Sequence, residues 1–284
     1  MKVLLPTDFS NNAFNAIVYA VELLKEKECI FYLLNTYTPI VYNYDYRMSA
    51  GGGLGKLRDV IKDHSVNKLK ELKSKLEDKY VFTNHSFEII SSFNTFSEEI
   101  KERVEELAID VIIMGTKGAS GVKEVLFGSN TVHIIKNSKC PVIAVPDEYS
   151  FEKPKNILFP TDFNIDYSED QLLVYKTIAN LYNAKLHILH ASRDRDLNSK
   201  EKINKEKLQT ILGDLKHQTH IVRDQEIPLA INEFQNNHHI ELLMMVNNKH
   251  SFFENLFFKP VINQIGFHLS TPFLVIPTKE KNQM

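Results

Sequence analysis

The sequence predicts an α/β protein made of two tandem doubly wound domains, each with a five-stranded parallel sheet and helices on both faces. Three observations predict it. Apolar segments of strand length alternate with longer amphipathic segments, three sequence anchors recur in both halves, and a polar stretch separates the halves. Alternating strands and helices are typical of βαβ units, in which helices cover a parallel sheet.

The recurring anchors define the domains. The segment "KVLLPTDFS" at 2–10 returns as "NILFPTDFN" at 156–164, "IDVIIMG" at 109–115 as "IELLMMV" at 240–246, and "CPVIAVP" at 140–146 as "TPFLVIP" at 271–277. A period of this length is a whole domain rather than a solenoid unit. We therefore expect domains at 1–147 and 155–279, joined by the linker "DEYSFEKPK" at 147–155.

The expected elements follow the same order in each half. In the first half we expect strands at 2–6, 29–36, 86–91, 110–115 and 140–146, and helices at 11–27, 57–79, 97–108 and 127–136. In the second half we expect strands at 155–160, 184–191, 217–222, 240–246 and 272–277, and helices at 167–182, 198–216, 226–238 and 258–268. The segment 37–56, rich in Tyr and Gly, has no counterpart of equal length. A lid or interaction role and a plain surface loop both remain open for it.

Composition limits the classes of partner. The formal net charge of the 284 residues is -2, which gives no electrostatic reason to expect nucleic acid or an anionic membrane as the main partner. Cys29 and Cys140 lack metal-ligand spacing and are expected to be small buried hydrophobes. The N-terminal "MKVLLPTDFS" is too short in apolar residues for a signal peptide. We expect a cytoplasmic protein.

Four of the ten glycines stand in "MGTKGASGVKEVLFGS" at 114–129. The segment lies between an expected strand and an expected helix, at the sheet edge where ligands bind in open α/β folds. We expect Gly115 and Gly118 to let the backbone approach a ligand closely, and Gly128 and Ser129 to begin a helix whose free amides and dipole suit a phosphate. A plain glycine-rich loop is the alternative.

Two better-known phosphate motifs are excluded. The tract "AGGGLGKL" at 50–57 fails as a P-loop at Ala50 and Leu57, and the glycines from 115 to 121 are three residues apart, unlike the dinucleotide fingerprint.

The spacing Gly115-x2-Gly118-x9-Gly128-Ser129 resembles the ATP-binding signature of the universal stress protein family. The segments "VLLPTDFS", "LLNTY" at 33–37 and "SKCPVIAVP" at 138–146 are similar to the first, second and closing strands of that family, and the resemblance covers the whole chain as a tandem pair. It implies a Rossmann-like fold of the adenine nucleotide alpha hydrolase type and a stress-response protein that binds ATP, with Mg²⁺ on the phosphates. It also implies a nucleotide shell of Pro6, Asp8, Thr36, Met114, Gly115, Lys117, Gly118, Gly128, Ser129, Asn130 and Thr131.

Individual residues support or qualify this resemblance. The carboxylate of Asp8 could accept hydrogen bonds from ribose hydroxyls. Asp8 or Ser10 could also cap the following helix, which would stabilise it by about 1 kcal/mol, and both roles hold together if Ser10 is the cap and Asp8 contacts the ligand. The hydroxyls of Ser129 and Thr131 could contact phosphate oxygens. Asn35 stands where the family usually has histidine, and we expect no consequence of that departure.

The second half lacks the signature. Aligned through the closing strand, its residues at the positions of Gly115, Gly118, Gly128 and Ser129 are Val246, Lys249, Lys259 and Pro260. Asp162 is retained, and a turn or capping role explains it. We therefore predict no ATP binding there. The segment "NNKHSFFENLFF" at 247–258 is expected either to pack on its own core or to expose an apolar patch for a protein partner.

No catalytic or metal-binding residue is predicted. His238-His239 and His217 with His220 have no carboxylate or cysteine at a recognised ligand spacing, and His187 and His190 should point to opposite faces of a strand. No nucleophile elbow, Cys/His pair or carboxylate pair is found, so at most weak ATP hydrolysis is expected. A nucleotide-free scaffold or chaperone-like module is the other alternative.

The closing strands offer a reason for the duplication. We expect "VIAVP" and "FLVIP" to pair, so that one chain forms its own pseudo-dimer. Further assembly into homodimers stays open.

Overall fold

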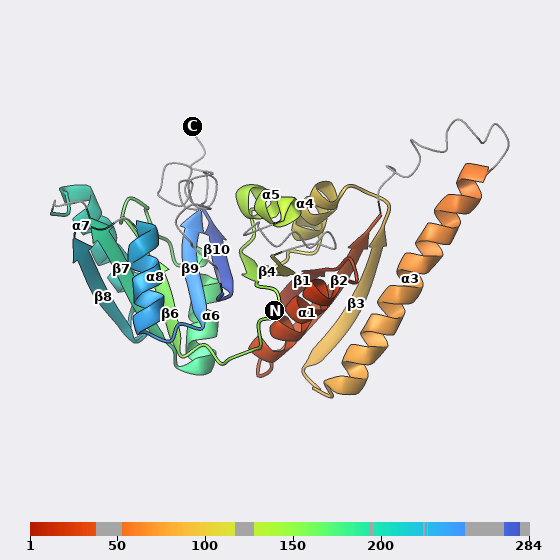
Figure 1. Cartoon of the computed structure of the whole chain (residues 1–284), viewed down its shortest axis with the longest axis horizontal. Helices are drawn as coiled ribbons and strands as arrows, with labels where there is room; N and C mark the ends of the chain where they lie inside the picture. The colour runs from red at the N-terminus through yellow and green to blue at the C-terminus, as the bar shows by residue number, and fades with distance from the viewer. Residues whose placement is uncertain are drawn as a thin grey trace.

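The computed structural model describes residues 1–37, 53–116, 128–192, 196–223, 225, 227–247 and 270–278, and it confirms the α/β class. One ten-stranded sheet runs through the molecule in the order β3-β2-β1-β4-β5-β10-β9-β6-β7-β8 (Figure 1). Its strands are β1 (Lys2–Pro6), β2 (Cys29–Thr36), β3 (His85–Ser92), β4 (Val111–Gly115), β5 (Val142–Val145), β6 (Asn156–Pro160), β7 (Lys185–Ser192), β8 (His217–Arg223), β9 (Leu242–Asn247) and β10 (Phe273–Pro277).

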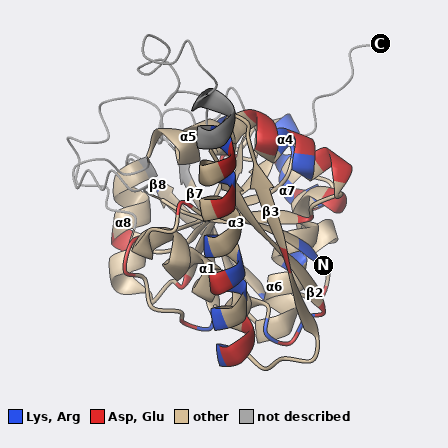
Figure 2. Cartoon of the chain, turned by 90° about the vertical axis from the view of Figure 1, so that its right-hand side faces the viewer, with Lys and Arg blue, Asp and Glu red and all other residues tan. Residues whose placement is uncertain are grey.

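Helices cover both faces of this sheet. They are α1 (Asn11–Leu23), α3 (Gly53–Lys79), α4 (Phe96–Glu106), α5 (Ser129–Asn137), α6 (Leu173–Tyr182), α7 (Ser199–Leu212) and α8 (Ile227–Asn237), with a short 3₁₀ helix, η2 (Asp170–Leu172). The predicted helix at 258–268 lies outside the described residues, as does most of the segment 37–56. The long helix α3 lies along the outer side of the first half, and Lys and acidic residues recur along its length (Figure 2). No helix within the described ranges combines the length and the apolar character needed to span a membrane.

Three predicted helices were too long at one end by more than two residues. Helix α1 ends at Leu23 rather than residue 27, because Leu24–Lys27 close into turns in which the Lys27 N–H donates to the Leu24 carbonyl at 2.8 Å. Helix α7 ends at Leu212 because Gly213 adopts φ +54°. Helix α6 begins at Leu173 rather than 167, because Tyr167 is fully buried and its hydroxyl lies 2.5 Å from the Thr161 hydroxyl.

The strands separate two hydrophobic cores because successive side chains point to opposite faces. In β4, Val111 and Ile113 face the core under α1, α3, α6 and α7, whereas Ile112 and Met114 face the core under α4, α5 and α8. Both faces are covered, so the strands are apolar throughout, as is usual for parallel sheets. Cys29 and Cys140 are buried free thiols, as predicted.

The two sets of five strands meet at the closing strands. β5 and β10 pair antiparallel with Ala144 opposite Phe273, as expected, and all other neighbouring strands pair parallel. The two predicted sheets are therefore continuous. Hydrogen bonds also cross between the halves, from the Tyr182 hydroxyl to the Leu23 carbonyl at 2.8 Å and from the Asn247 amide to the Ile135 carbonyl at 3.0 Å.

Candidate functional site

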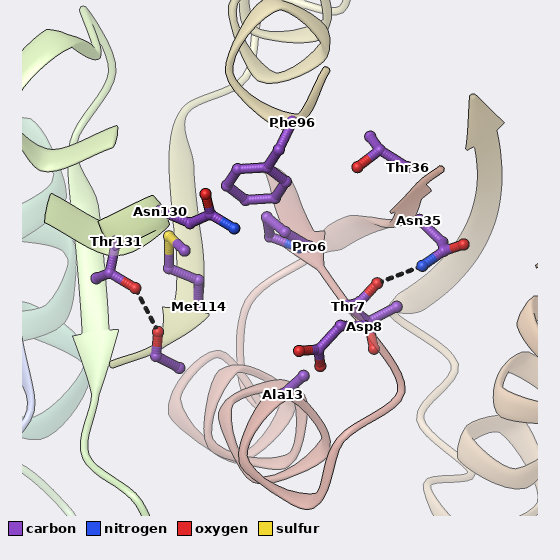
Figure 3. A pocket seen from close by; sticks show the side chains of 11 residues that line it. Pro6, Thr7, Asp8, Ala13, Asn35, Thr36, Phe96, Met114, Asn130 and Thr131 are labelled. Atoms are coloured by element: carbon purple, nitrogen blue, oxygen red, sulfur yellow. Dashed lines mark hydrogen bonds between the residues drawn. The ribbon is translucent and has the colours of Figure 1, made fainter. Parts of the chain in front are cut away.

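A pocket of about 260 Å³ opens at the carboxyl ends of β1, β2 and β4, where the first turns of α4 and α5 converge (Figure 3). Side chains of Phe96, Asn130 and Met114 gather on one side around Pro6, and the carboxylate of Asp8 lies on the other side beside Ala13 (Figure 3). The described residues that line it are Pro6, Thr7, Asp8, Ala13, Asn35, Thr36, Phe96, Met114, Gly115, Asn130 and Thr131.

The turn from β1 into α1 places Asp8 in this pocket. The Thr7 hydroxyl accepts from the Phe9 N–H at 3.0 Å, and a carboxylate oxygen of Asp8 accepts from the Ser10 N–H at 3.0 Å. Phe9 takes φ +64°, a left-handed conformation that these short polar bonds hold in place. Ser10 caps α1 by accepting from the Ala13 N–H at 3.2 Å, so the capping role falls to Ser10.

The second half repeats this turn. The Thr161 hydroxyl accepts from the Phe163 N–H at 3.1 Å, Asp162 accepts from the Asn164 N–H at 3.0 Å, and Phe163 takes φ +56°. This confirms the turn role predicted for Asp162. Because Asp8 makes the same bond, turn geometry explains why both halves carry aspartate here, and Asp162 becomes a natural control for any further role of Asp8.

A buried network fixes the end of β1 beside the pocket. The Asn35 amide donates to the Thr7 carbonyl at 2.7 Å, and the Ser65 hydroxyl donates to the Asn35 side-chain oxygen at 2.7 Å. In the second half His190 makes the matching contact, 2.9 Å from Nδ1 to the Thr161 carbonyl. Asn35 thus has a structural role that the sequence did not reveal. Its amide contacts the Thr7 carbonyl as the His190 imidazole contacts the equivalent Thr161 carbonyl in the second half.

Gly115 also has a packing role, which the sequence did not reveal. A Cβ at this position would lie 2.6 Å from Oδ1 of Asn12, which comes from α1. The missing side chain therefore lets a helix pack closely on β4. The Thr131 hydroxyl is also engaged, since it donates to the Gly115 carbonyl at 3.0 Å and joins α5 to β4 (Figure 3).

Helix α5 points its first turn toward the pocket. Gly128 is its N-cap, and no side chain in the described part of the chain caps it. The Gly128 N–H itself donates to the Thr116 carbonyl at 2.6 Å, so the amides that follow it carry the positive end of the helix dipole. Ser129 is exposed outside the pocket lining, and Lys117 and Gly118 lie outside the described residues.

The structure thus brings together seven of the eleven sequence-predicted residues: Pro6, Asp8, Thr36, Met114, Gly115, Asn130 and Thr131. Sequence reasoning missed Thr7, Ala13 and Phe96 and assigned Asn35 no role. Phe96 is the first residue of α4, the helix that follows β3 at this edge of the sheet. That position after a strand is the signal that could have identified it.

Hydrogen bonds hold the first turn of α4, and with it Phe96, in place. Glu99 is buried; burial alone would raise the pKa of its carboxyl, but hydrogen bonds from Ser92, Arg103 and Asn94 outweigh it and lower that pKa. The Ser92 hydroxyl, at the end of β3, donates to Glu99 at 2.7 Å. The start of α4 is therefore tied to the sheet by an ionised carboxylate.

At the position of Gly115 the second half has Val246, which is 4% exposed and belongs to the core under α6 and α7. A side chain therefore fills the space that Gly115 must leave open. Lys249, Lys259 and Pro260 lie outside the described residues.

Folding brings His187 close to His220 and His239 close to two carboxylates. His187 and His190 point to opposite faces of β7, as predicted, and His187 Nδ1 lies 3.1 Å from His220 Nε2. The sequence gives His239 no carboxylate at a recognised ligand spacing, but folding brings Glu152 of the linker and Glu241 against it. Spacing along the chain could not reveal Glu152, which is 87 residues away.

Comparisons with known proteins point to one family. The sequence model of the universal stress protein family matches residues 1–146. The universal stress proteins MJ0577 and MJ0531 of Methanocaldococcus jannaschii are 32% and 29% identical over 155 and 156 residues, which are 51% and 54% of this chain and 93% and 83% of theirs. A crystal structure of a universal stress protein from Archaeoglobus fulgidus superposes with a TM-score of 0.70 at 20% identity, covering 97% of this chain and 98% of that one.

Proposed function

The chain belongs to the universal stress protein family, and on that premise we propose that its first half binds an adenine nucleotide, with ATP as the expected form, in a stress response. One observation carries the proposal. Seven residues that the family resemblance implied, from four separate segments of the chain, line a single pocket beside the start of α5. Family signature and geometry therefore indicate the same place.

The lining residues suit the parts of a nucleotide. Pro6, Phe96 and Met114 offer apolar surface for a base, and Asp8 offers a carboxylate to ribose hydroxyls. The first-turn amides of α5 suit phosphate oxygens, since a helix N-terminus attracts anions. Mg²⁺, carried on the phosphates, would supply charge neutralisation there.

The pocket of about 260 Å³ is slightly smaller than the roughly 300–1,000 Å³ of typical ligand pockets. A base and ribose are the parts expected within it. The phosphates are expected toward α5 and the segment 117–127, where the signature places Lys117 and Gly118.

We propose binding and regulation rather than turnover. Asp8 is the one titratable side chain among the described lining residues, and phosphoryl transfer needs several positioned charges and an oriented nucleophile. The free buried thiols of Cys29 and Cys140 support the cytoplasmic location expected from the sequence.

For the second half, taken as a domain at 155–279, we propose a structural or partner-binding role without ATP. The side chain of Val246 in place of Gly115 supports this. The pairing of β5 with β10 supports a tandem pseudo-dimer within one chain, whose first domain, at 1–147, holds the nucleotide.

The first experiment is to purify the protein without added nucleotide, denature it and identify released small molecules by chromatography and mass spectrometry. We expect about one adenine nucleotide per chain. Two per chain would contradict the assignment of the second half. No released nucleotide, together with no calorimetric binding of added ATP and Mg²⁺, would favour the nucleotide-free scaffold.

A matched pair of variants then locates the site. Asp8→Asn removes the carboxylate charge while its amide oxygen can still accept from Ser10, and Asp162→Asn makes the same change in the equivalent turn. We expect Asp8→Asn to weaken ATP binding about 10-fold, from a lost charged hydrogen bond of roughly 1.5–3 kcal/mol. Asp162→Asn should leave affinity unchanged, and equal losses in both variants would show a general effect on folding.

A further inference from the structure

Three side chains with metal-ligating atoms meet where the linker joins the second half. Glu152 belongs to the linker, His239 follows α8, and Glu241 precedes β9. Their ligand atoms all lie within 4.8 Å of one another. The linker and the α8–β9 connection run side by side at this end of the sheet (Figure 1).

From this geometry we propose that Glu152, His239 and Glu241 bind a divalent transition-metal ion, Zn²⁺ in the first instance. The site lies apart from the nucleotide pocket, on residues that the family signature does not include. It does not depend on the function proposed above.

The distances suit a small tetrahedral ion. His239 Nε2 lies 2.6 Å from Glu152 Oε2 and 3.7 Å from Glu241 Oε1. Two ligand atoms that bind one Zn²⁺ at about 2.0–2.1 Å are separated by about 3.3 Å in tetrahedral geometry. The observed separations lie on either side of that value, so small rotations of the exposed Glu152 and His239 side chains would complete the arrangement.

Glu241 makes the site preorganised. Its side chain is 5% exposed, and Oε2 accepts from the Asn156 N–H at 2.7 Å and from the Lys155 N–H at 3.2 Å. The second oxygen, Oε1, is the one that faces His239. A carboxylate fixed by outer hydrogen bonds in this way is a typical metal ligand.

The donor set selects the class of ion. His nitrogen and Glu oxygen both bind Zn²⁺, and three protein ligands leave a fourth position for water. Mg²⁺ and Ca²⁺ prefer oxygen ligands alone. Glu152 and His239 are exposed, so an ion can enter from solvent.

Binding would replace the hydrogen bond between His239 and Glu152. The imidazole binds metal in its neutral form, so a protonated His239 must first release its Nε2 proton to solvent. Because protons and the metal compete for the same imidazole nitrogen, affinity should fall as the pH is lowered. A bound ion would fix the linker to the α8–β9 connection.

The test titrates Co²⁺ into nucleotide-free, EDTA-treated full-length protein, follows the visible absorption of tetrahedral Co²⁺, and then displaces Co²⁺ with Zn²⁺. The variants are His239→Gln and Glu152→Gln, both at exposed positions and expected to fold normally by circular dichroism. The matched control is His238→Gln, a neighbouring histidine whose ring stacks on Phe234 at 4.1 Å between centroids.

We expect one ion per chain, at least 10-fold weaker binding in His239→Gln and Glu152→Gln, and unchanged binding in His238→Gln. If the wild-type protein binds no Co²⁺, the cluster is only an ion pair between His239 and the carboxylates, and the proposal is overturned. Loss in His238→Gln with retention in His239→Gln would also overturn it and assign the ion to the neighbouring cluster of His187, His220 and His238.

Discussion

Asn12 of α1 occupies the space beside Gly115 of β4, so closely that a Cβ on Gly115 would lie 2.8 Å from Cγ of Asn12. Asn12 is 6% exposed and cannot simply turn out into solvent. The glycine that begins the sequence signature is therefore also a packing residue, and its replacement acts on stability as well as on any ligand.

Gly115→Ala should lower the free energy of unfolding by about 1–3 kcal/mol, the usual cost of inserting a methyl group into a packed core. Urea denaturation monitored by circular dichroism measures the change. The reason is tested by a double-mutant cycle with Asn12→Ala, which removes the atoms that the new methyl would meet. In that background Gly115→Ala should cost less, and an equal cost in both backgrounds would contradict the packing argument.

Asn35→Ala should destabilise the protein by about 1–3 kcal/mol, because it leaves the Thr7 carbonyl without its buried amide donor and removes one of the two hydrogen-bond partners of the Ser65 hydroxyl, the other being Ser91. Asn35→His should cost less than Asn35→Ala, since His190 makes the corresponding contact to Thr161 in the second half. Thermal unfolding of the two variants decides this. If histidine proved as costly as alanine, the equivalence of the two positions would be refuted.

Much of the fold could be predicted because local pattern and global structure agree. Each predicted strand lies within two residues of an observed one, since apolar runs such as that of β4 are buried on both faces. The error at α6 has a tertiary cause, because the bond between Tyr167 and Thr161 holds residues that by periodicity alone would be helical.

The candidate site could be predicted where its residues are marked by their place next to an expected strand or helix. Asp8, Met114 and Thr131 stand next to strand ends or a helix start, and a sequence reveals such places. The contact of Asn12 with Gly115 and the approach of Glu152 to His239 join residues 103 and 87 positions apart. A single sequence carries no signal for such pairs, so these contacts required the structure.

Acid should destabilise the second half through His187. Burial, followed by the nearby charges of Lys185, His220 and His238, lowers the pKa of the His187 imidazole to about 4. Since the unfolded chain takes up this proton near pH 6.5, the unfolded state binds more protons between about 6.5 and about 4. The free energy of unfolding should therefore fall as the pH drops through that window.

Urea denaturation at several pH values between 7 and 4 measures this dependence. His187→Gln should flatten it, and His64→Gln on the exposed side of α3 controls for the loss of any histidine. A slope that is identical in His187→Gln and wild-type protein would assign the acid sensitivity to other groups.

Phe96 provides the last prediction, because it lines the pocket yet lies outside the sequence signature. If its ring contacts a base, Phe96→Ala should weaken ATP binding about 10-fold, as expected from stacking energies of roughly 1–3 kcal/mol per base. Its side chain is only half-buried at the start of α4, so the variant should remain folded. Calorimetric titration with ATP gives the affinity.

Phe82→Ala is the matched control, since Phe82 is also half-buried but precedes β3 at the opposite end of the sheet. It should bind ATP as the wild type does. Titrations of wild-type protein and Phe96→Ala with GTP and CTP refine the assignment. A stacking contact accepts any base, so Phe96→Ala should weaken the binding of all three nucleotides by the same factor. Phe96→Ala with unchanged affinity would place the base elsewhere in the pocket, whereas a loss confined to ATP would mean that Phe96 shapes an adenine-specific contact rather than a stacking surface.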